Sequence, residues 1–196
     1  MSDELPNLKR AMRAELRERR RIMTSSEVEN ATEQLTLHLT RLTERLGAKY
    51  VAAYLPNPDE PNIRPWLNWT HEQGIRVLLP ISRDDGLLDW VLGDGEHELQ
   101  GRFGVPEAVG EVLGPIAINE VDLIIVPAAS VDRSGMRMGW GRGYYDRMLG
   151  SMQQRPPVYA VVFDNELVDE VPTDVHDKPV DGVVTPSGIA ELQQST

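Results

Sequence analysis

The apolar positions of the first 47 residues recur every three or four places, which is the spacing of an amphipathic helix. The apolar stripe of a first helix is formed by Leu5, Leu8, Met12 and Leu16. Lys9 and Arg13 lie one turn apart on another face of this helix. A second helix is predicted to begin at a capping box between Thr24 and Glu27 and to end at Gly47. Its apolar stripe is Val28, Ala31, Leu35, Leu39, Leu42 and Leu46.

Beyond residue 47 the pattern changes to short apolar runs separated by polar segments. Strands are predicted at 50–55, 75–81, 87–92, 121–128, 158–163 and 181–185, and helices at 63–74 and from about Gly143. We expect the strand at 87–92 to form a hairpin with the segment near Leu99. Strands that alternate with helices predict an α/β protein of a single domain, 1–196, with an open, largely parallel sheet and helices on both faces. The helices of residues 1–47 would pack on this sheet, and a frayed tail would start at about residue 190.

Composition and charge narrow the classes of function. The 196 residues include no cysteine, which excludes disulfides and thiolate zinc sites. Neither a membrane-length apolar run nor a signal-peptide core is visible, so we expect a cytoplasmic protein that does not contact a membrane. Seven basic and four acidic residues give positions 1–22 a net charge of +3, while the remainder carries −14. This favours a small anionic ligand over nucleic acid, although a solvated helix face or an RNA-binding segment at 9–21 remains an alternative.

The segment "GMRMGWGRGYYDRML", residues 135–149, is the most unusual part of the chain. Its four glycines give a flexible backbone with exposed N–H groups, and Arg137 and Arg142 offer paired donors for phosphate or carboxylate oxygens. The segment then enters a helix, whose N-terminus favours anions. Residues 135–143, the Gly-Arg loop, are therefore predicted to bind an anion, with a structural glycine-rich turn as the alternative. The loop matches neither the Walker A motif nor the dinucleotide fingerprint.

Asp146 has two interpretations. It can pair with Arg142 or Arg147 in the first helical turn, or it can bind Mg²⁺ together with Asp177, since magnesium–nucleotide sites use one or two carboxylates. Spacing alone favours the ion pair.

Because ligands of such sheets bind beyond the carboxyl ends of the strands, loop 56–62, the Gly-Arg loop and loop 164–181 are expected to form one site.

The signature D-x-x-G-M-R-M-G-W-G-R-G-Y-Y-D-R-M-L resembles that of the 5-formyltetrahydrofolate cyclo-ligase family. Three further segments fit the family in the same order: a K-x-x-x-R helix at Lys9 and Arg13, the loop "LPNPDEPN", and "FGVPEA" at 103–108. The ending "VPTDVHDKPVDGVVT" fits as well. The resemblance implies MgATP-dependent conversion of 5-formyltetrahydrofolate to 5,10-methenyltetrahydrofolate, with release of ADP and phosphate.

The resemblance also implies roles for individual residues. ATP would be bound by Lys9, Arg13, Arg137, Met138, Gly139, Trp140, Gly141, Arg142, Gly143, Tyr144 and Tyr145. The reduced folate would contact Leu55, Glu60, Trp140, Gly141, Arg142, Gly143 and Tyr144. Mg²⁺ would be held by Asp146 and Asp177, and Arg142 and Tyr144 would act at the reacting centre. The protein would work as a monomer.

Three residues depart from the pattern of this family. Trp140 stands where a small or basic residue is common, Arg142 where glycine or lysine is common, and Glu166 where we expect glutamine. These changes bear on substrate preference rather than on the fold. Two alternatives therefore stay open: a family member that binds nucleotide or folate without turnover, and an ATP-dependent enzyme for another formylated or carboxylated substrate.

Overall fold

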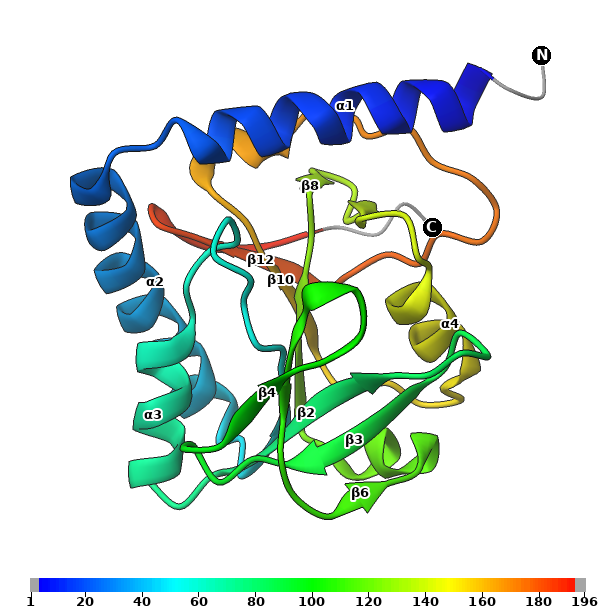
Figure 1. The fold of residues 1–196 in the computed structure, drawn as a ribbon. Coiled ribbons are helices and arrows are strands. Elements are labelled where there is room, and N and C mark those ends of the chain that lie inside the picture. The colour runs from blue at the N-terminus through cyan, green and yellow to red at the C-terminus, as the bar shows by residue number, and fades with distance from the viewer. Residues whose placement is uncertain (1–3, 193–196) are drawn as a thin grey trace.

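The computed structural model describes residues 4–192, which build an eight-stranded sheet in the order β13-β12-β10-β7-β1-β2-β3-β6 (Figure 1). The strands are β1 (Tyr50–Ala52), β2 (Arg76–Ser82), β3 (Leu88–Leu92), β6 (Val112–Leu113), β7 (Leu123–Pro127), β10 (Val158–Val161), β12 (Gly182–Thr185) and β13 (Gly188–Glu191). The five central strands run parallel, and antiparallel strands flank them on both sides. This confirms the predicted α/β class and the largely parallel sheet.

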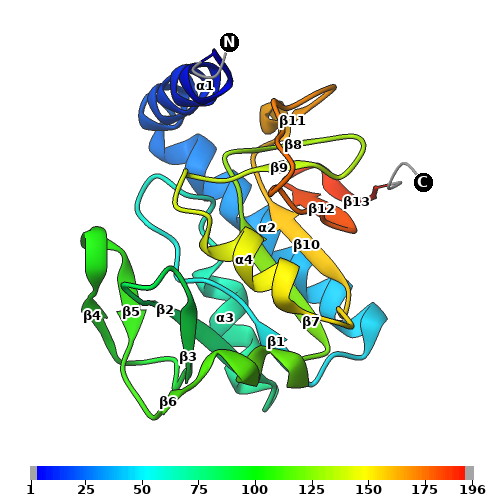
Figure 2. The same cartoon turned by 90° about the vertical axis from the view of Figure 1, so that its right-hand side faces the viewer.

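Helices cover both faces of this sheet, as the sequence predicts (Figure 2). On one face lie α2 (Ser25–Leu46) and α3 (Arg64–Glu72), which contribute the fully buried Leu35, Leu39 and Trp66 to the core. On the other face lies α4 (Tyr144–Ser151) with Met148 and Leu149, next to the 3₁₀ helix η2 (Pro115–Glu120). The capping box at Thr24 and the left-handed Gly47 limit α2 as expected.

The first helix, α1 (Glu4–Arg21), lies across the carboxyl ends of the central strands (Figure 1). Its apolar contacts are with a small three-stranded sheet of β8 (Ser130–Asp132), β9 (Arg137–Met138) and β11 (Leu167–Val168). The prediction that both N-terminal helices pack on the main sheet is therefore correct for α2 and wrong for α1. Leu8 is 51% exposed and Lys9 only 7%, so the lysine and not the leucine faces inward. Two acidic partners for the charge, Asp174 and Asp177, make this possible.

Two further predictions need correction. The strand β3 pairs with β2 and β6, whereas Leu99 lies in β4 (Glu98–Gln100), which pairs with β5 (Pro106–Ala108) in a separate ribbon. The tight turn between β2 and β3 already sets the partner of β3, with Gly86 at φ +82°. At the C-terminus, β13 extends to Glu191, so pairing with β12 orders the start of the expected tail. The rest of that tail, 193–196, lies outside the described residues.

The remaining short elements are the 3₁₀ helices η1 (Arg102–Gly104) and η3 (Asp164–Glu166). Among residues 4–192, we find no helix with the length and apolar character needed to cross a membrane.

Candidate functional site

A cleft of about 1390 Å³ opens between α1 and the carboxyl ends of the central strands. Loop 56–62, the Gly-Arg loop and loop 164–181, which the sequence leads us to expect at one site, all contribute to the walls of this cleft. The predicted residues that line it are Lys9, Arg13, Leu55, Glu60, Arg137, Gly139, Trp140, Gly141, Arg142, Gly143, Tyr144, Tyr145, Asp146 and Asp177. Met138 does not line it: the side chain is 1% exposed and packs beneath α1 with Leu16 and Val171.

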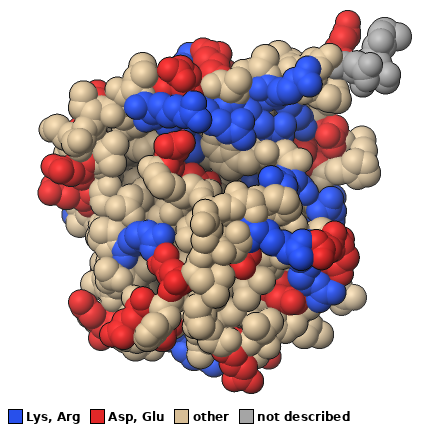
Figure 3. Space-filling view, in the orientation of Figure 1, with Lys and Arg blue, Asp and Glu red and all other residues tan. Residues whose placement is uncertain are grey.

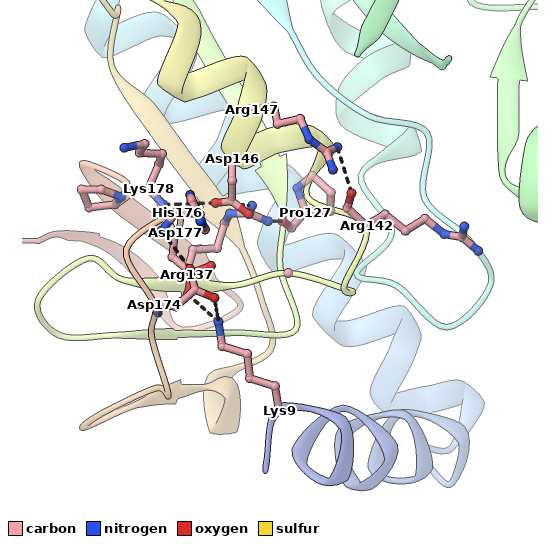
Figure 4. Close-up of polar contacts among 12 residues, drawn as sticks. Lys9, Pro127, Arg137, Arg142, Asp146, Arg147, Asp174, His176, Asp177 and Lys178 are labelled. Atoms are coloured by element: carbon pink, nitrogen blue, oxygen red, sulfur yellow. Dashed lines mark hydrogen bonds and ion pairs between the residues drawn. The ribbon is translucent and has the colours of Figure 1, made fainter. Parts of the chain in front are cut away.

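Lys9 reaches from α1 to two acids of loop 164–181 (Figure 4). Its Nζ donates to Asp177 Oδ2 at 2.6 Å and to Asp174 Oδ2 at 3.2 Å. The backbone N–H of His176, followed in importance by Lys9, holds the pKa of Asp174 below its usual range. The amine therefore lies within a charged cluster, and the pairing explains how a lysine on α1 can be buried.

Arg137 is a buried cation within the Gly-Arg loop, at 3% exposure (Figure 4). Its Nη1 donates to the carbonyl of Pro127 at 2.9 Å, and its Nη2 lies 3.3 Å from Asp146 Oδ1. That oxygen also accepts from the backbone N–H of Lys178 at 3.1 Å. The ion pair expected for Asp146 exists, but with Arg137 in place of Arg142 or Arg147, because Arg147 donates to backbone carbonyls instead.

The donor set for a divalent cation is limited to a few carboxylates. Among the described residues, we find no group of three or more His, Asp or Glu side chains that could hold a metal ion by themselves. Asp146 Oδ2 and Asp177 Oδ1 each receive no hydrogen bond from residues 4–192, which leaves one oxygen of each carboxylate available. Two carboxylates fit Mg²⁺ when phosphate oxygens and water complete its octahedral shell.

The Gly-Arg loop is held against α1 by Arg13. The Arg13 Nε donates to the carbonyl of Gly139 at 2.7 Å. The pKa of Arg13 is lowered, mainly because the guanidinium is partly buried. Gly141 has a φ of +99°, a backbone conformation that favours glycine, and a Cβ there would lie 3.1 Å from Arg13 Nη1, a tight contact from which the arginine would have to move. Gly143, also left-handed, caps α4 and directs the N-terminus of that helix to the cleft.

Arg142 and Tyr144, the residues expected at the reacting centre, both contact the opposite wall. The Tyr144 hydroxyl donates to the carbonyl of Arg83 at 2.8 Å. The guanidinium of Arg142 stacks on the half-exposed ring of Phe103, 3.3 Å from its centre. Phe103 has a φ of +60°. This left-handed backbone conformation is energetically unfavourable for any residue that carries a side chain. The two residues thus link the Gly-Arg loop to the β2–β3 turn and to η1.

At the other end of α1, Arg20 forms a buried bidentate ion pair with Glu166 at 2.7 and 2.8 Å. Tyr54 and Glu60 lie within the electrostatic reach of this pair. Burial raises the pKa of Glu60, and the Asn57 N–H, which donates to Glu60 Oε2 at 2.9 Å, only partly opposes this shift. Burial likewise raises the pKa of Tyr54, whose hydroxyl has no partner among the described residues.

Sequence reasoning missed several residues that line this cleft. They are Arg17, Arg20, Tyr54, Arg147 and Asp174. The two arginines continue the three- and four-residue spacing of Lys9 and Arg13, a signal that was present in the sequence. Tyr54 and Asp174 belong to segments recognised as strand and loop, and only the tertiary structure brings them to the cleft.

Comparisons with known proteins give one consistent result. A sequence model of the 5-formyltetrahydrofolate cyclo-ligase family matches residues 6–186. The 5-formyltetrahydrofolate cyclo-ligase of Mycolicibacterium smegmatis is 37% identical, over 96% of this chain and 99% of that protein. The Escherichia coli enzyme of the same name is 29% identical over 90% and 99%. Among solved structures, the 5,10-methenyltetrahydrofolate synthetase of Aquifex aeolicus superposes with a TM-score of 0.80, at 27% identity and over 96% and 95% of the two chains.

Proposed function

Because the chain belongs to the 5-formyltetrahydrofolate cyclo-ligase family, we propose that it converts 5-formyltetrahydrofolate to 5,10-methenyltetrahydrofolate with MgATP, releasing ADP and phosphate. The observation that carries this proposal is the cleft itself. Basic side chains from α1 and the Gly-Arg loop, and the acids Asp146 and Asp177, come from distant parts of the chain and line one cavity. The basic residues suit phosphates, and the acids suit the cation that accompanies them.

The reaction needs activation because a formamide oxygen is a poor leaving group. In the proposed sequence, the formyl oxygen attacks the γ-phosphorus of ATP and the bond to ADP breaks. The folate N10 then attacks the formyl carbon and loses its proton, and the carbon–oxygen bond breaks to release phosphate. The protein contributes mainly orientation and charge neutralisation, as is typical of phosphoryl transfer.

We assign the phosphates to the part of the cleft around Lys9. Lys9, Arg13 and Arg137 converge there from α1 and β9, and the N-terminus of α4 adds its dipole. ATP would replace Asp174 and Asp177 as a partner of Lys9, because phosphate oxygens carry more charge. Asp146 and Asp177 would hold Mg²⁺, which neutralises the charge that develops on the phosphates.

We assign the folate to the part of the cleft around Glu60 and Leu55. The Glu60 carboxylate can accept hydrogen bonds from the amino and ring N–H groups of a pterin, and Leu55, at 6% exposure, offers an apolar surface. Arg142, in the Gly-Arg loop, and Tyr144, the first residue of α4, both line the cleft, and we assign them to its middle, between the two ligands. That position is where the formyl oxygen and the γ-phosphate would have to meet.

The direct test is the formation of methenyltetrahydrofolate, followed by its near-ultraviolet absorbance, from 5-formyltetrahydrofolate with and without MgATP. Product that requires MgATP is the expected result. A folded protein that binds ATP and makes no product would contradict the proposal and favour a non-turnover binder or another formylated substrate.

We also propose that the enzyme acts as a cytoplasmic monomer without nucleic acid. Figure 3 shows a band of Lys and Arg side chains over α1. Four basic residues of α1, Lys9, Arg13, Arg17 and Arg20, line the cleft. Basic residues that bind a small anionic ligand in the cleft cannot at the same time neutralise the phosphates of a nucleic acid. Sedimentation of the protein alone and with RNA tests both points.

A further inference from the structure

Arg20 is a buried cation that the proposed chemistry does not use. It is 5% exposed, and its side chain and that of Glu166 are each 2% exposed. Arg20 Nε donates to Glu166 Oε1 at 2.7 Å and Nη2 to Oε2 at 2.8 Å. Removing two charges from water is costly, and a buried pair therefore adds little net stability compared with apolar side chains of similar size. Its role lies in the geometry that it imposes.

The same guanidinium joins separate walls of the cleft. Arg20 Nη2 also donates to the carbonyl of Ala128, just after β7, at 2.9 Å. Glu166 Oε2 in turn accepts from the backbone N–H of Phe163, after β10, at 2.8 Å. Arg20 thus connects α1 with the carboxyl ends of two neighbouring strands.

Its third neighbour is the Gly-Arg loop. The Arg20 guanidinium lies 4.9 Å from the centre of the Trp140 ring, and the Arg17 guanidinium lies 4.9 Å from the same ring. Trp140 stands between Gly139 and Gly141, so it is the only residue of that tripeptide with a side chain for α1 to hold. Cation–π contacts of this kind are stronger where water is excluded.

We propose that Arg20 is a positioning residue which, through Trp140, fixes the Gly-Arg loop in its ligand-binding conformation before a ligand arrives. The inference rests on the proposed function, in which this loop binds ATP. A loop rich in glycine loses much conformational entropy when it becomes ordered, and that loss weakens binding unless the loop is ordered beforehand. Arg20 and Trp140 order it from α1.

The proposal also accounts for two departures from the family pattern. Glu166 occupies the position where the family resemblance leads us to expect glutamine, and here its carboxylate neutralises Arg20. Trp140 occupies the position of a small or basic residue, and here it supplies the ring on which Arg20 rests. Arg20, Trp140 and Glu166 therefore act as one set.

The test replaces the pair without leaving a buried charge. In the double variant Arg20→Met/Glu166→Gln, the methionine retains much of the apolar bulk between Trp140 and Phe163, and the glutamine oxygen still accepts from the Phe163 N–H. The net charge is unchanged. The matched control is Glu15→Gln/Arg19→Met, which removes an exposed ion pair of the same kind from the same helix.

Two measurements separate positioning from a structural role. The first is the Kd for ATP without folate by titration calorimetry, and the second is the rate of tryptic cleavage after the exposed Arg142. We expect the double variant to melt close to the wild type, to bind ATP about tenfold more weakly and to be cleaved faster, because a misplaced binding loop is costly. The control should match the wild type in both measurements.

Wild-type values for both Kd and cleavage in the folded double variant would overturn the proposal. If the double variant does not fold, the same two measurements are made on Arg20→Lys. Lysine keeps the positive charge but cannot form the planar, bidentate contact with Glu166, so weaker ATP binding and faster cleavage are again expected. Unchanged loop cleavage in that variant would also overturn it. Failure of the wild type to bind ATP would contradict the proposed function instead, and the cleavage rates would still test the anchoring of the loop.

Discussion

The two ends of α1 face two differently built parts of the cleft. At the Lys9 end, opposite charges are paired, Lys9 with Asp174 and Asp177, and Arg137 with Asp146. At the Arg20 end, Arg20 is also paired, with Glu166, but three buried polar atoms lack a partner among the described residues: Arg20 Nη1, Tyr54 Oη and Trp140 Nε1. At the Lys9 end, Arg137 Nε is the corresponding atom without a partner. The residues from Lys9 to Arg20 span about 16 Å of helix axis, so one straight helix serves both ends.

Because they are built differently, the two ends of the cleft suit different ligands. Where charges are already paired, a ligand must exchange one ionic partner for another, which suits a polyanion with its own cation. Where burial raises the pKa of Glu60 and leaves hydroxyl and N–H groups without partners, a ligand is recognised by hydrogen bonds and apolar contact. We therefore expect salt to weaken ATP binding more than folate binding.

The largest effect is expected from Asp146→Asn at the Lys9 end. The amide oxygen can still accept from the Lys178 N–H, but the charge next to Arg137 and the proposed Mg²⁺ is lost. Because charge stabilisation is a large part of phosphoryl transfer, kcat should fall by about 10²- to 10³-fold. Initial rates over a range of Mg²⁺ concentrations measure this. Asp169→Asn, at a side chain 96% exposed, is the control, and equal losses in both variants would contradict the assignment.

The second prediction concerns Lys9→Met. Loss of the amine leaves Asp174 and Asp177 facing the phosphates without their cation, so the KM for ATP should rise by about tenfold or more. The KM for the folate should stay close to that of the wild type. Arg10→Met, at the exposed neighbour that bonds only within α1, is the matched control. A rise in the folate KM alone would place the ligands at the opposite ends.

The Arg20 end is tested by Glu60→Gln. The amide cannot accept two N–H groups of a pterin as the carboxylate can, so the KM for 5-formyltetrahydrofolate should rise by about tenfold. The KM for ATP should remain unchanged. Glu29, an exposed glutamate of α2 that is not among the residues lining the cleft, provides the control Glu29→Gln. An unchanged folate KM in Glu60→Gln would remove Glu60 from the substrate site.

The smallest effect is a pH dependence of stability. Burial raises the pKa of Glu60 in the folded state, so folding favours the protonated form. That contribution is fully present below the pKa of the unfolded carboxyl and is lost as the pH rises through the folded-state pKa. Glu60→Gln cannot lose a proton, and it should gain stability relative to the wild type as the pH rises through this window. Urea denaturation at several pH values tests this, and a difference that does not vary with pH contradicts it.

Much of the fold could be predicted because its elements have local signals. The capping box at Thr24, the left-handed Gly47 and the apolar strand at 121–128 each follow from short-range chemistry. The partner of β3 was predicted wrongly although the turn at Gly86 is a local signal for pairing with β2, because several nearby apolar segments were candidates for the same strand edge. The inward orientation of Lys9 depends on acids 165 or more residues away.

The candidate site shows the same division. Periodicity predicted α1, and the glycine and arginine content of 135–143 led to the hypothesis of an anion site, because both depend on neighbouring residues. The partner of Asp146 was wrong because Arg137 approaches it from β9, and no spacing rule covers that contact. Arg20 and Glu166, 146 residues apart, could be connected only once the fold was known.

We propose that the Lys9 end of the cleft binds ATP and that the Arg20 end binds the folate. The most direct measurement is calorimetric titration of MgATP alone and of 5-formyltetrahydrofolate alone into wild type, Lys9→Met and Glu60→Gln. We expect Lys9→Met to bind MgATP more weakly than the wild type and the folate equally well. We expect the reverse for Glu60→Gln. Both variants losing affinity for the same ligand, or Lys9→Met losing only the folate, would contradict it.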